Sequence, residues 1–157
     1  MPVPALFRRG GRCYIIPDLF TIGYQQTTQP AVIDALREAG VTHLLDVRAV
    51  PQSRKPGFSK SVFGASLEAA GIRYTHLRGL GTPKAGRDAV RHGHPEIMHR
   101  IFRAHMAEPA AQADLARAGA FATAAPVCLL CFERDPAQCH RTLVAEFLGR
   151  TPRHLFA

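Results

Sequence analysis

Two segments of the chain follow the same plan, in which a helix stops at a glycine and is followed by a strand. They span residues 30–48 and 59–77, with Gly40 and Gly71 at the stops. Apolar residues recur at helical spacing before each glycine, and a short apolar run follows it. Helices and strands that alternate in this way build βαβ units, in which a parallel sheet is covered by helices.

Three further apolar runs complete the predicted sheet. They are "LFTIGY" at 19–24, "PVCLLCFE" at 126–133 and "RHLFA" at 153–157. Short runs of this kind are typical of strands that are buried on both faces of a parallel sheet. We therefore predict an α/β fold, a single-domain three-layer sandwich whose mostly parallel sheet of about five strands is flanked by helices. The domain covers residues 19–157, and residues 1–18 form an N-terminal extension.

The remaining segments are expected to be helical, with one exception. Residues 95–109 and 109–121 predict two helices that are divided by Pro109, and a last helix is expected at about 140–148. The exception is residues 79–94, which are rich in glycine and basic residues and show no helical period. We expect a long loop there, either a functional lid or a disordered excursion.

The charge of the chain favours an anionic partner. Its 157 residues carry a formal net charge of +8, and most of the basic residues are arginines. The planar guanidinium of arginine donates two parallel hydrogen bonds, which suits phosphate and carboxylate groups. We therefore expect a nucleotide or a nucleic acid as partner. The composition of a GC-rich genome is the alternative explanation of the same charge.

The sequence also favours a cytoplasmic protein without a membrane partner. The apolar stretches of the N-terminal extension are interrupted by Arg8, Arg9, Arg12 and Pro17, so it does not resemble a signal peptide. No apolar run reaches the roughly 20 residues that a membrane-spanning helix needs. In that compartment we expect the four cysteines to be reduced rather than paired.

Polar residues follow each predicted strand at its carboxyl end, where open parallel sheets bind their ligands. They are Gly23 and Tyr24 after the first strand, Asp46, Arg48 and Ser53 after the second, His76 after the third, and Cys131, Glu133 and Arg134 after the fourth. Because these ends meet at one edge of the sheet, we expect a site there. Asp46 and Arg48 point to the same side of an extended strand, so they either address a ligand together or pair to brace the loop.

Cys128 and Cys131 look like a metal-binding or redox pair, but their position argues against it. Both lie inside an apolar run, and an odd separation along a strand sends two side chains to opposite faces. We therefore predict that Cys128 is a small core residue.

Cys139 has a different setting, because it follows a turn and comes just before the last predicted helix. Backbone N–H groups at a helix N-terminus stabilise a thiolate and attract anions. Arg134, His140 and Arg141 add positive charge, and Glu133 lies on the strand just before the turn. An activated thiol beside an anion site is one expectation, and an ordinary thiol is the other.

The motifs "TIGY", "LLDVRAVPQSR", "GIRYTHLRGLG" and "LLCFERDPAQCHR" together resemble the family catalogued as domain of unknown function 488. The resemblance spans about residues 19–148 and implies a compact α/β domain without an assigned reaction. Its motif positions correspond to Gly23, Asp46, Arg48, Pro51, Ser53, Cys131, Glu133, Cys139, His140 and Arg141. The chain departs from the pattern at Tyr24, where the family often has histidine.

Three hypotheses about function follow. The first is an enzyme without a cofactor that acts on a phosphate-bearing substrate, a nucleotide or nucleic acid. In it Arg48, Arg134 and Arg141 bind the anion, Glu133 or Asp46 is the acid or base, and Cys139 is a nucleophile. The other residues of this predicted site are Gly23, Tyr24, Ser53, His76, Cys131 and His140.

The second hypothesis is a noncatalytic nucleic-acid-binding module that uses the same arginines. The third and weakest is a metal site made of Cys131, Cys139 and His140. The oligomeric state stays open.

Overall fold

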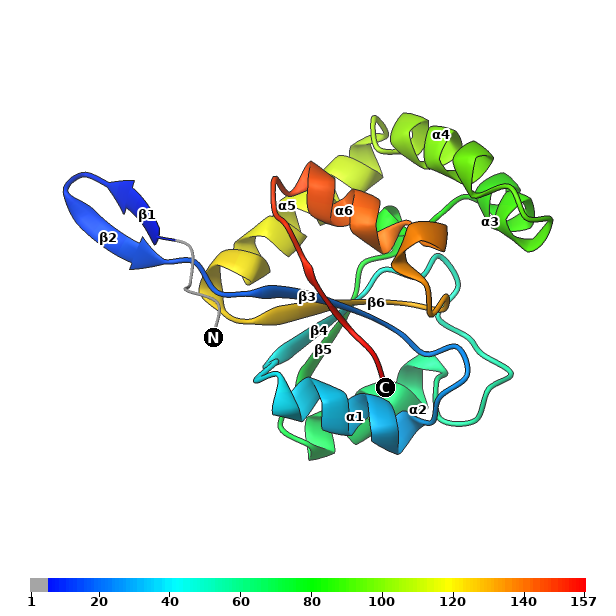
Figure 1. The fold of residues 1–157 in the computed structure, drawn as a ribbon, viewed down its shortest axis with the longest axis horizontal. Helices are drawn as coiled ribbons and strands as arrows, with labels where there is room; N and C mark the ends of the chain where they lie inside the picture. Colours follow the sequence, from blue (N-terminus) through cyan, green and yellow to red (C-terminus); the bar gives the residue numbers. More distant parts are fainter. Residues whose placement is uncertain (1–5) are drawn as a thin grey trace.

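Five strands of residues 6–157, the part of the chain that the computed structural model describes, form one sheet in the middle of the molecule (Figure 1). They are β3 (Leu19–Gly23), β4 (His43–Asp46), β5 (Arg73–His76), β6 (Val127–Cys131) and β7 (Arg153–Leu155). Their spatial order is β5-β4-β6-β3-β7, and every neighbouring pair is parallel. The predicted strand at the end of the chain is confirmed as β7.

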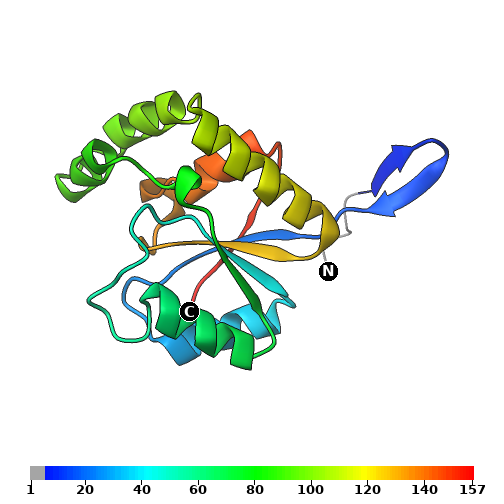
Figure 2. The ribbon, with the colours of Figure 1, turned by 180° about the vertical axis from the view of Figure 1, so that it is seen from behind.

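Helices cover both faces of this sheet. Helices α1 (Gln29–Glu38) and α2 (Lys60–Ala69) lie on one face, and α5 (Pro109–Ala124) and α6 (Arg141–Phe147) lie on the other, as Figures 1 and 2 show from opposite sides. Helices α3 (Lys84–Arg91) and α4 (Pro95–His105) extend the second layer, and one-turn helices occur at Arg78–Leu80 and Pro136–Gln138. The three-layer α/β sandwich predicted from the sequence is confirmed.

The central strand β6 separates two hydrophobic cores. All of its residues are buried, and their side chains alternate between the faces. Leu129 packs into the core under α4, α5 and α6, whereas Cys128 and Leu130 pack into the core under α1 and α2. The prediction that Cys128 is a core residue is confirmed.

Glycine ends the first two helices as the sequence indicates. Gly40 and Gly71 have φ angles of 75° and 78°, in the left-handed region that other residues rarely adopt. Thr28 caps the start of α1 by accepting a hydrogen bond from the backbone N–H of Ala31. Ser59 precedes α2 without capping it, because its hydroxyl binds the loop at Ser53 instead.

Residues 79–94 are not the long loop that the sequence predicts, because they contain α3. Gly86 within this helix made the sequence look unlike a helix, because a glycine destabilises an isolated helix by about 1 kcal/mol. In the fold the same residue serves packing: a Cβ on Gly86 would lie 2.6 Å from Thr82 Cγ2 and 3.4 Å from Met98 Cγ of α4. Contact with α4 therefore stabilises a helix that the local sequence does not predict.

The segment predicted as an N-terminal extension contains a hairpin. Strands β1 (Leu6–Arg9) and β2 (Arg12–Ile15) pair antiparallel in a small sheet of their own, which projects from the body of the protein (Figures 1 and 2). Residues 1–5 of the extension lie outside the described residues. Within residues 6–157, no helix has the length and apolar character needed to cross a membrane.

Gly23 is required where β3 and β6 end side by side. It pairs with Cys131, and a Cβ at this position would overlap the backbone carbonyl oxygen of Glu133. We expect Gly23→Ala to lower the free energy of unfolding by about 2 kcal/mol, because the β6 end must shift to make room. Urea unfolding followed by circular dichroism measures the change.

Gly119→Ala is the matched control, because its Cβ would meet only Leu148 Cδ2 at 3.7 Å, an ordinary contact. Inside α5 this change should raise stability by roughly 0.5 to 1 kcal/mol. Equal effects of the two substitutions would show that the close approach at Gly23 does not constrain the fold.

Candidate functional site

A pocket of about 830 Å³ lies at the carboxyl ends of the strands. The chain leaves β4 toward α2 on one face and leaves the neighbouring β6 toward α6 on the other, so the two loops diverge and leave a crevice between them. The residues that line it come from the end of β6, from the loops after β3, β4, β5 and β6, and from helix α3. Among them are Tyr24, Gln25, Arg48, Ser53, Arg54, Thr82, Arg87, Arg91, Cys131, Phe132, Glu133, Gln138, Cys139 and His140. The pocket therefore lies at the edge of the sheet where the sequence predicts a site.

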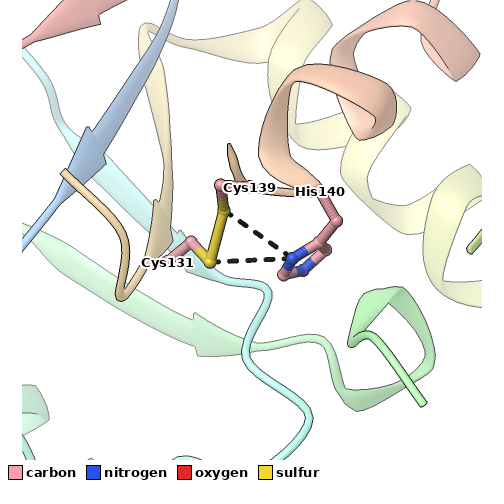
Figure 3. A group of neighbouring side chains, drawn as sticks. All are labelled: Cys131, Cys139 and His140. Atoms are coloured by element: carbon pink, nitrogen blue, oxygen red, sulfur yellow. Dashed lines mark hydrogen bonds between the residues drawn. A yellow bond between two sulfur atoms is a disulfide. The ribbon is translucent and has the colours of Figure 1, made fainter. Parts of the chain in front are cut away.

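Two cysteines and a histidine meet in the lining of this pocket (Figure 3). Cys131 ends β6, and the turn at Pro136–Gln138 brings Cys139 back beside it, where the two sulfurs form a disulfide. The expectation that all cysteines are reduced therefore fails in this structure. It fails because the turn at Pro136–Gln138 brings the sulfurs of Cys131 and Cys139 together, and their spacing along the sequence does not reveal this proximity. Among the described residues, Cys13 and Cys128 are unpaired.

The unprotonated ring nitrogen of His140, Nδ1, faces the sulfurs of Cys131 and Cys139. Its Nε2 lies 2.7 Å from the carbonyl oxygen of Val47, and because a carbonyl only accepts, Nε2 carries the hydrogen. Its Nδ1 lies 3.6 Å from Cys131 Sγ and 3.7 Å from Cys139 Sγ. Burial lowers the pKa of His140 to about 4, so the ring is neutral near pH 7 and Nδ1 keeps its lone pair.

Glu133 adds an acid to the same group of side chains. Its Oε2 lies 3.0 Å from Cys131 Sγ, and its side chain lines the pocket. Burial raises the pKa of this carboxyl above its ordinary value, while the positive charge of Arg141 and Arg91 partly opposes the rise. Such a group exchanges protons closer to neutral pH than an exposed glutamate does.

Cys139 lies just before α6, as the sequence predicts, but its sulfur is not a free thiol. Helix α6 begins at Arg141, and Cys139 has the extended backbone angles φ −125° and ψ 149° at the end of the one-turn helix. Its sulfur is buried and bonded to Cys131. Reactivity of this thiol therefore requires reduction of the disulfide first.

Asp46 and Arg48 form a buried ion pair beside the pocket. The Nε and Nη2 atoms of Arg48 donate to the two carboxylate oxygens at 2.9 and 2.7 Å, and Tyr74 donates its hydroxyl to Asp46 Oδ2. Nη1 of Arg48 donates to the Tyr24 hydroxyl and to the carbonyl of Phe58. Of the two possibilities left open by the sequence, the geometry favours the brace: Arg48 borders the pocket, but most of its donors already have protein partners.

Three other predicted residues support this brace or its loop. Tyr24 is buried and stacks on Phe58 with ring centroids 4.3 Å apart. His76 places Nε2 2.8 Å from the carbonyl oxygen of Arg48, and Ser53 accepts a hydrogen bond from the backbone of Lys55. Tyr24 and Ser53 also line the pocket, so a ligand there would touch both.

The two arginines after β6 bind the protein itself. Arg141 is fully buried and donates to the backbone carbonyls of Glu133 and Arg134 and to the hydroxyl of Thr21 on β3. Arg134 donates to the carbonyl of Ala157. Neither side chain is among those lining the pocket, so a ligand there would not contact the two arginines that the sequence predicts to bind the anion.

Other arginines supply the positive charge of the pocket. Arg54 comes from the loop after β4, and Arg87 and Arg91 come from α3. The sequence marks the loop of Arg54 and the basic segment of α3, but Arg87 and Arg91 were missed as individual site residues. Helical spacing of four residues is the signal that places both on one face of a helix.

Comparison with known proteins identifies the family of the chain. The family model described as domain of unknown function DUF488 matches residues 28–148, about three quarters of the chain. The chain belongs to this family. The match covers the segments that contribute Asp46, Arg48 and the turn from Cys131 to Arg141. Neither the curated proteins nor the solved structures contain a match to the chain.

The brace gives a testable prediction for this DUF488 domain. Asp46→Asn leaves the Arg48 guanidinium buried without its counter-charge, and we expect a loss of about 3 kcal/mol in the free energy of unfolding. Asp18→Asn, which removes the exposed partner of Arg153, should change stability by less than about 1 kcal/mol. Chemical denaturation measures both, and equal losses would contradict a special role for the buried pair.

Proposed function

We propose that this protein is an enzyme that acts on a phosphate-bearing substrate, a nucleotide or nucleic acid, in the pocket at the carboxyl ends of the strands. The observation that carries the proposal is the composition of the pocket. Arg54, Arg87 and Arg91 line a cavity that also contains Glu133, an acid with a raised pKa. Anion binding and proton transfer are thereby available in one pocket.

The arginines on α3 are suited to hold a phosphate group. Arg87 donates Nη1 to the carbonyl of Thr82, which fixes the guanidinium and leaves other N–H groups for a ligand. Arg91 is more exposed and pairs with Asp88 on the same helix at 3.3 Å, a contact that a phosphate can replace. Anion binding is thus assigned to Arg54, Arg87 and Arg91 instead of Arg134 and Arg141.

Glu133 is the acid–base residue of the proposal. A partly desolvated carboxyl can accept a proton from an attacking oxygen or give one to a leaving oxygen at near-neutral pH. The charge of Arg91 acts on the same carboxyl, so the anion site and the acid lie close together. Asp46 is less suited to the role, because its oxygens bind Arg48 and Tyr74.

The size and lining of the pocket suit a nucleotide. Its volume of about 830 Å³ falls within the roughly 300 to 1,000 Å³ typical of small-molecule sites. Phe132 lines it with 43% of its surface exposed, which offers a ring face on which a base can stack. The adjacent Tyr24 ring packs edge-on against Phe132 and supports its orientation.

Turnover of a substrate panel tests the proposal. We expect release of product from at least one member of a set of aryl phosphate esters, nucleotides and single-stranded RNA and DNA, assayed with oxidised and with reduced protein. Glu133→Gln should lower kcat by roughly 10²- to 10⁴-fold, the usual effect of losing an acid–base residue. Arg91→Gln should raise KM because the phosphate loses a contact.

Arg117→Gln is the matched control for Arg91. Both arginines are exposed, lie on a helix and pair with an aspartate three residues earlier, but only Arg91 lines the pocket. Activity that survives Glu133→Gln would contradict the acid–base role of Glu133, and no turnover of any panel member would contradict the enzyme. Binding without turnover that weakens steeply with salt would instead identify the noncatalytic nucleic-acid-binding module.

A further inference from the structure

We propose that the reduced protein binds one Zn²⁺ ion through Cys131 Sγ, Cys139 Sγ and His140 Nδ1. The candidate ligand atoms of these three residues all lie within 4.8 Å of one another, and all three residues are buried. Two thiolates and an imidazole are ligands that zinc prefers. Three protein ligands with a fourth position left open are the arrangement of catalytic zinc sites.

The distances from the histidine to the two sulfurs fit a tetrahedral ion. Zinc lies about 2.3 Å from a cysteine sulfur and about 2.0 Å from a histidine nitrogen, so a tetrahedron places sulfur and nitrogen roughly 3.5 Å apart. His140 Nδ1 lies 3.6 and 3.7 Å from the sulfurs of Cys131 and Cys139. The imidazole therefore needs little movement to coordinate the metal.

The backbone leaves room for the two sulfurs to separate. The Cα atoms of Cys131 and Cys139 are 7.0 Å apart, just beyond the range of about 4.4 to 6.8 Å that is usual for disulfides. Once the bond is reduced, rotation about the side-chain torsions can move the sulfurs to separate positions around an ion.

The contacts of His140 are those of a metal ligand. A coordinating histidine usually donates its other ring N–H to a carbonyl or carboxylate, which fixes the tautomer and turns the bare nitrogen to the metal. Here Val47 provides the carbonyl, and the ring also packs against Phe102 with centroids 5.2 Å apart. The orientation seen in Figure 3, with Nδ1 toward both sulfurs, is thus fixed before a metal arrives.

The open coordination position would face the pocket, because all three ligands line it. Water or a substrate oxygen can occupy that position, and Glu133 lies close enough to Cys131 to exchange a proton with bound water. This use of the metal rests on the proposed function, with zinc polarising the phosphate or activating water. Metal binding itself does not depend on it.

The disulfide makes the site conditional on redox state. A dithiol reductant supplies two electrons and two protons, which convert the Cys131–Cys139 bond to two thiols while the reductant becomes a disulfide. Binding of Zn²⁺ then releases both thiol protons to solvent, since thiolates are the ligands. The oxidised protein retains only the histidine and does not form the site.

Cobalt titration of the full chain tests the proposal. The protein is reduced with a phosphine, freed of the reductant without oxygen, and titrated with Co²⁺, which reports tetrahedral coordination by visible absorption and thiolate coordination by near-ultraviolet charge transfer. We expect saturation at about one equivalent, displacement by Zn²⁺ and no signal from the oxidised protein. Reduced protein with titratable thiols and no signal would overturn the proposal.

Matched variants assign the ligands. Cys139→Ala and His140→Asn should each abolish or strongly weaken cobalt binding, whereas Cys128→Ala, on the opposite face of β6, should leave it unchanged. Circular dichroism confirms that each variant is folded. Loss of the signal in Cys128→Ala with retention in folded Cys139→Ala would also refute the site. Absence of turnover together with stoichiometric cobalt binding would reject the proposed enzyme and leave the metal site intact.

Discussion

The candidate site depends on one buried guanidinium. Arg141 reaches from the first turn of α6 to the carbonyls of Glu133 and Arg134 and to the hydroxyl of Thr21. These bonds tie α6 to the turn after β6 and to β3, and they give hydrogen-bond partners to two carbonyls of the turn. Charged donors give the stronger hydrogen bonds, which suits a segment without regular secondary structure. The turn that Arg141 holds carries Glu133, Cys139 and His140 to the pocket.

A second buried charge orders the neighbouring loop. The Asp46–Arg48 pair joins the end of β4 to Tyr24, Tyr74 and Phe58, which come from three other segments of the chain. Desolvation makes such a pair a weak source of net stability, but removal of one partner leaves a costly unpaired charge. We infer that the pair mainly specifies how the loops after β3 and β4 meet. Arg141 thus fixes the turn after β6, and Arg48 fixes the loops after β3 and β4; both segments line the pocket.

Much of the architecture could be predicted because it depends on local patterns. Apolar runs indicate the buried strands, and glycines at Gly40 and Gly71 mark helix ends through a backbone conformation that few other residues adopt. The polar strand ends likewise predict the edge of the sheet at which the pocket lies. Helix α3 could not be predicted in this way, because its stability comes from packing of Gly86 against α4, a contact between residues distant in sequence.

The roles of individual site residues were harder to predict. An arginine after a strand looks the same in sequence whether it binds a ligand or a carbonyl of its own chain. The sequence therefore predicts anion binding for Arg134 and Arg141, which donate to carbonyls in the structure, and does not single out Arg87 and Arg91, which line the pocket. The partner of Cys131 was equally hidden, because the turn at Pro136–Gln138 decides which sulfurs meet. The residue types show which kinds of chemistry are available. The fold of the turn at Pro136–Gln138 determines which side chains lie close enough to one another to share it.

The central claim is that this turn assembles Cys131, Cys139 and His140 into a metal site that opens on the pocket. Anomalous diffraction at the zinc absorption edge, from crystals of reduced protein grown with zinc, tests it most directly. The account predicts one strong anomalous peak within bonding distance of both sulfurs and of His140 Nδ1, on the pocket side. Reduced, separated cysteines with no anomalous peak between them, or a zinc ion bound only elsewhere, would contradict it.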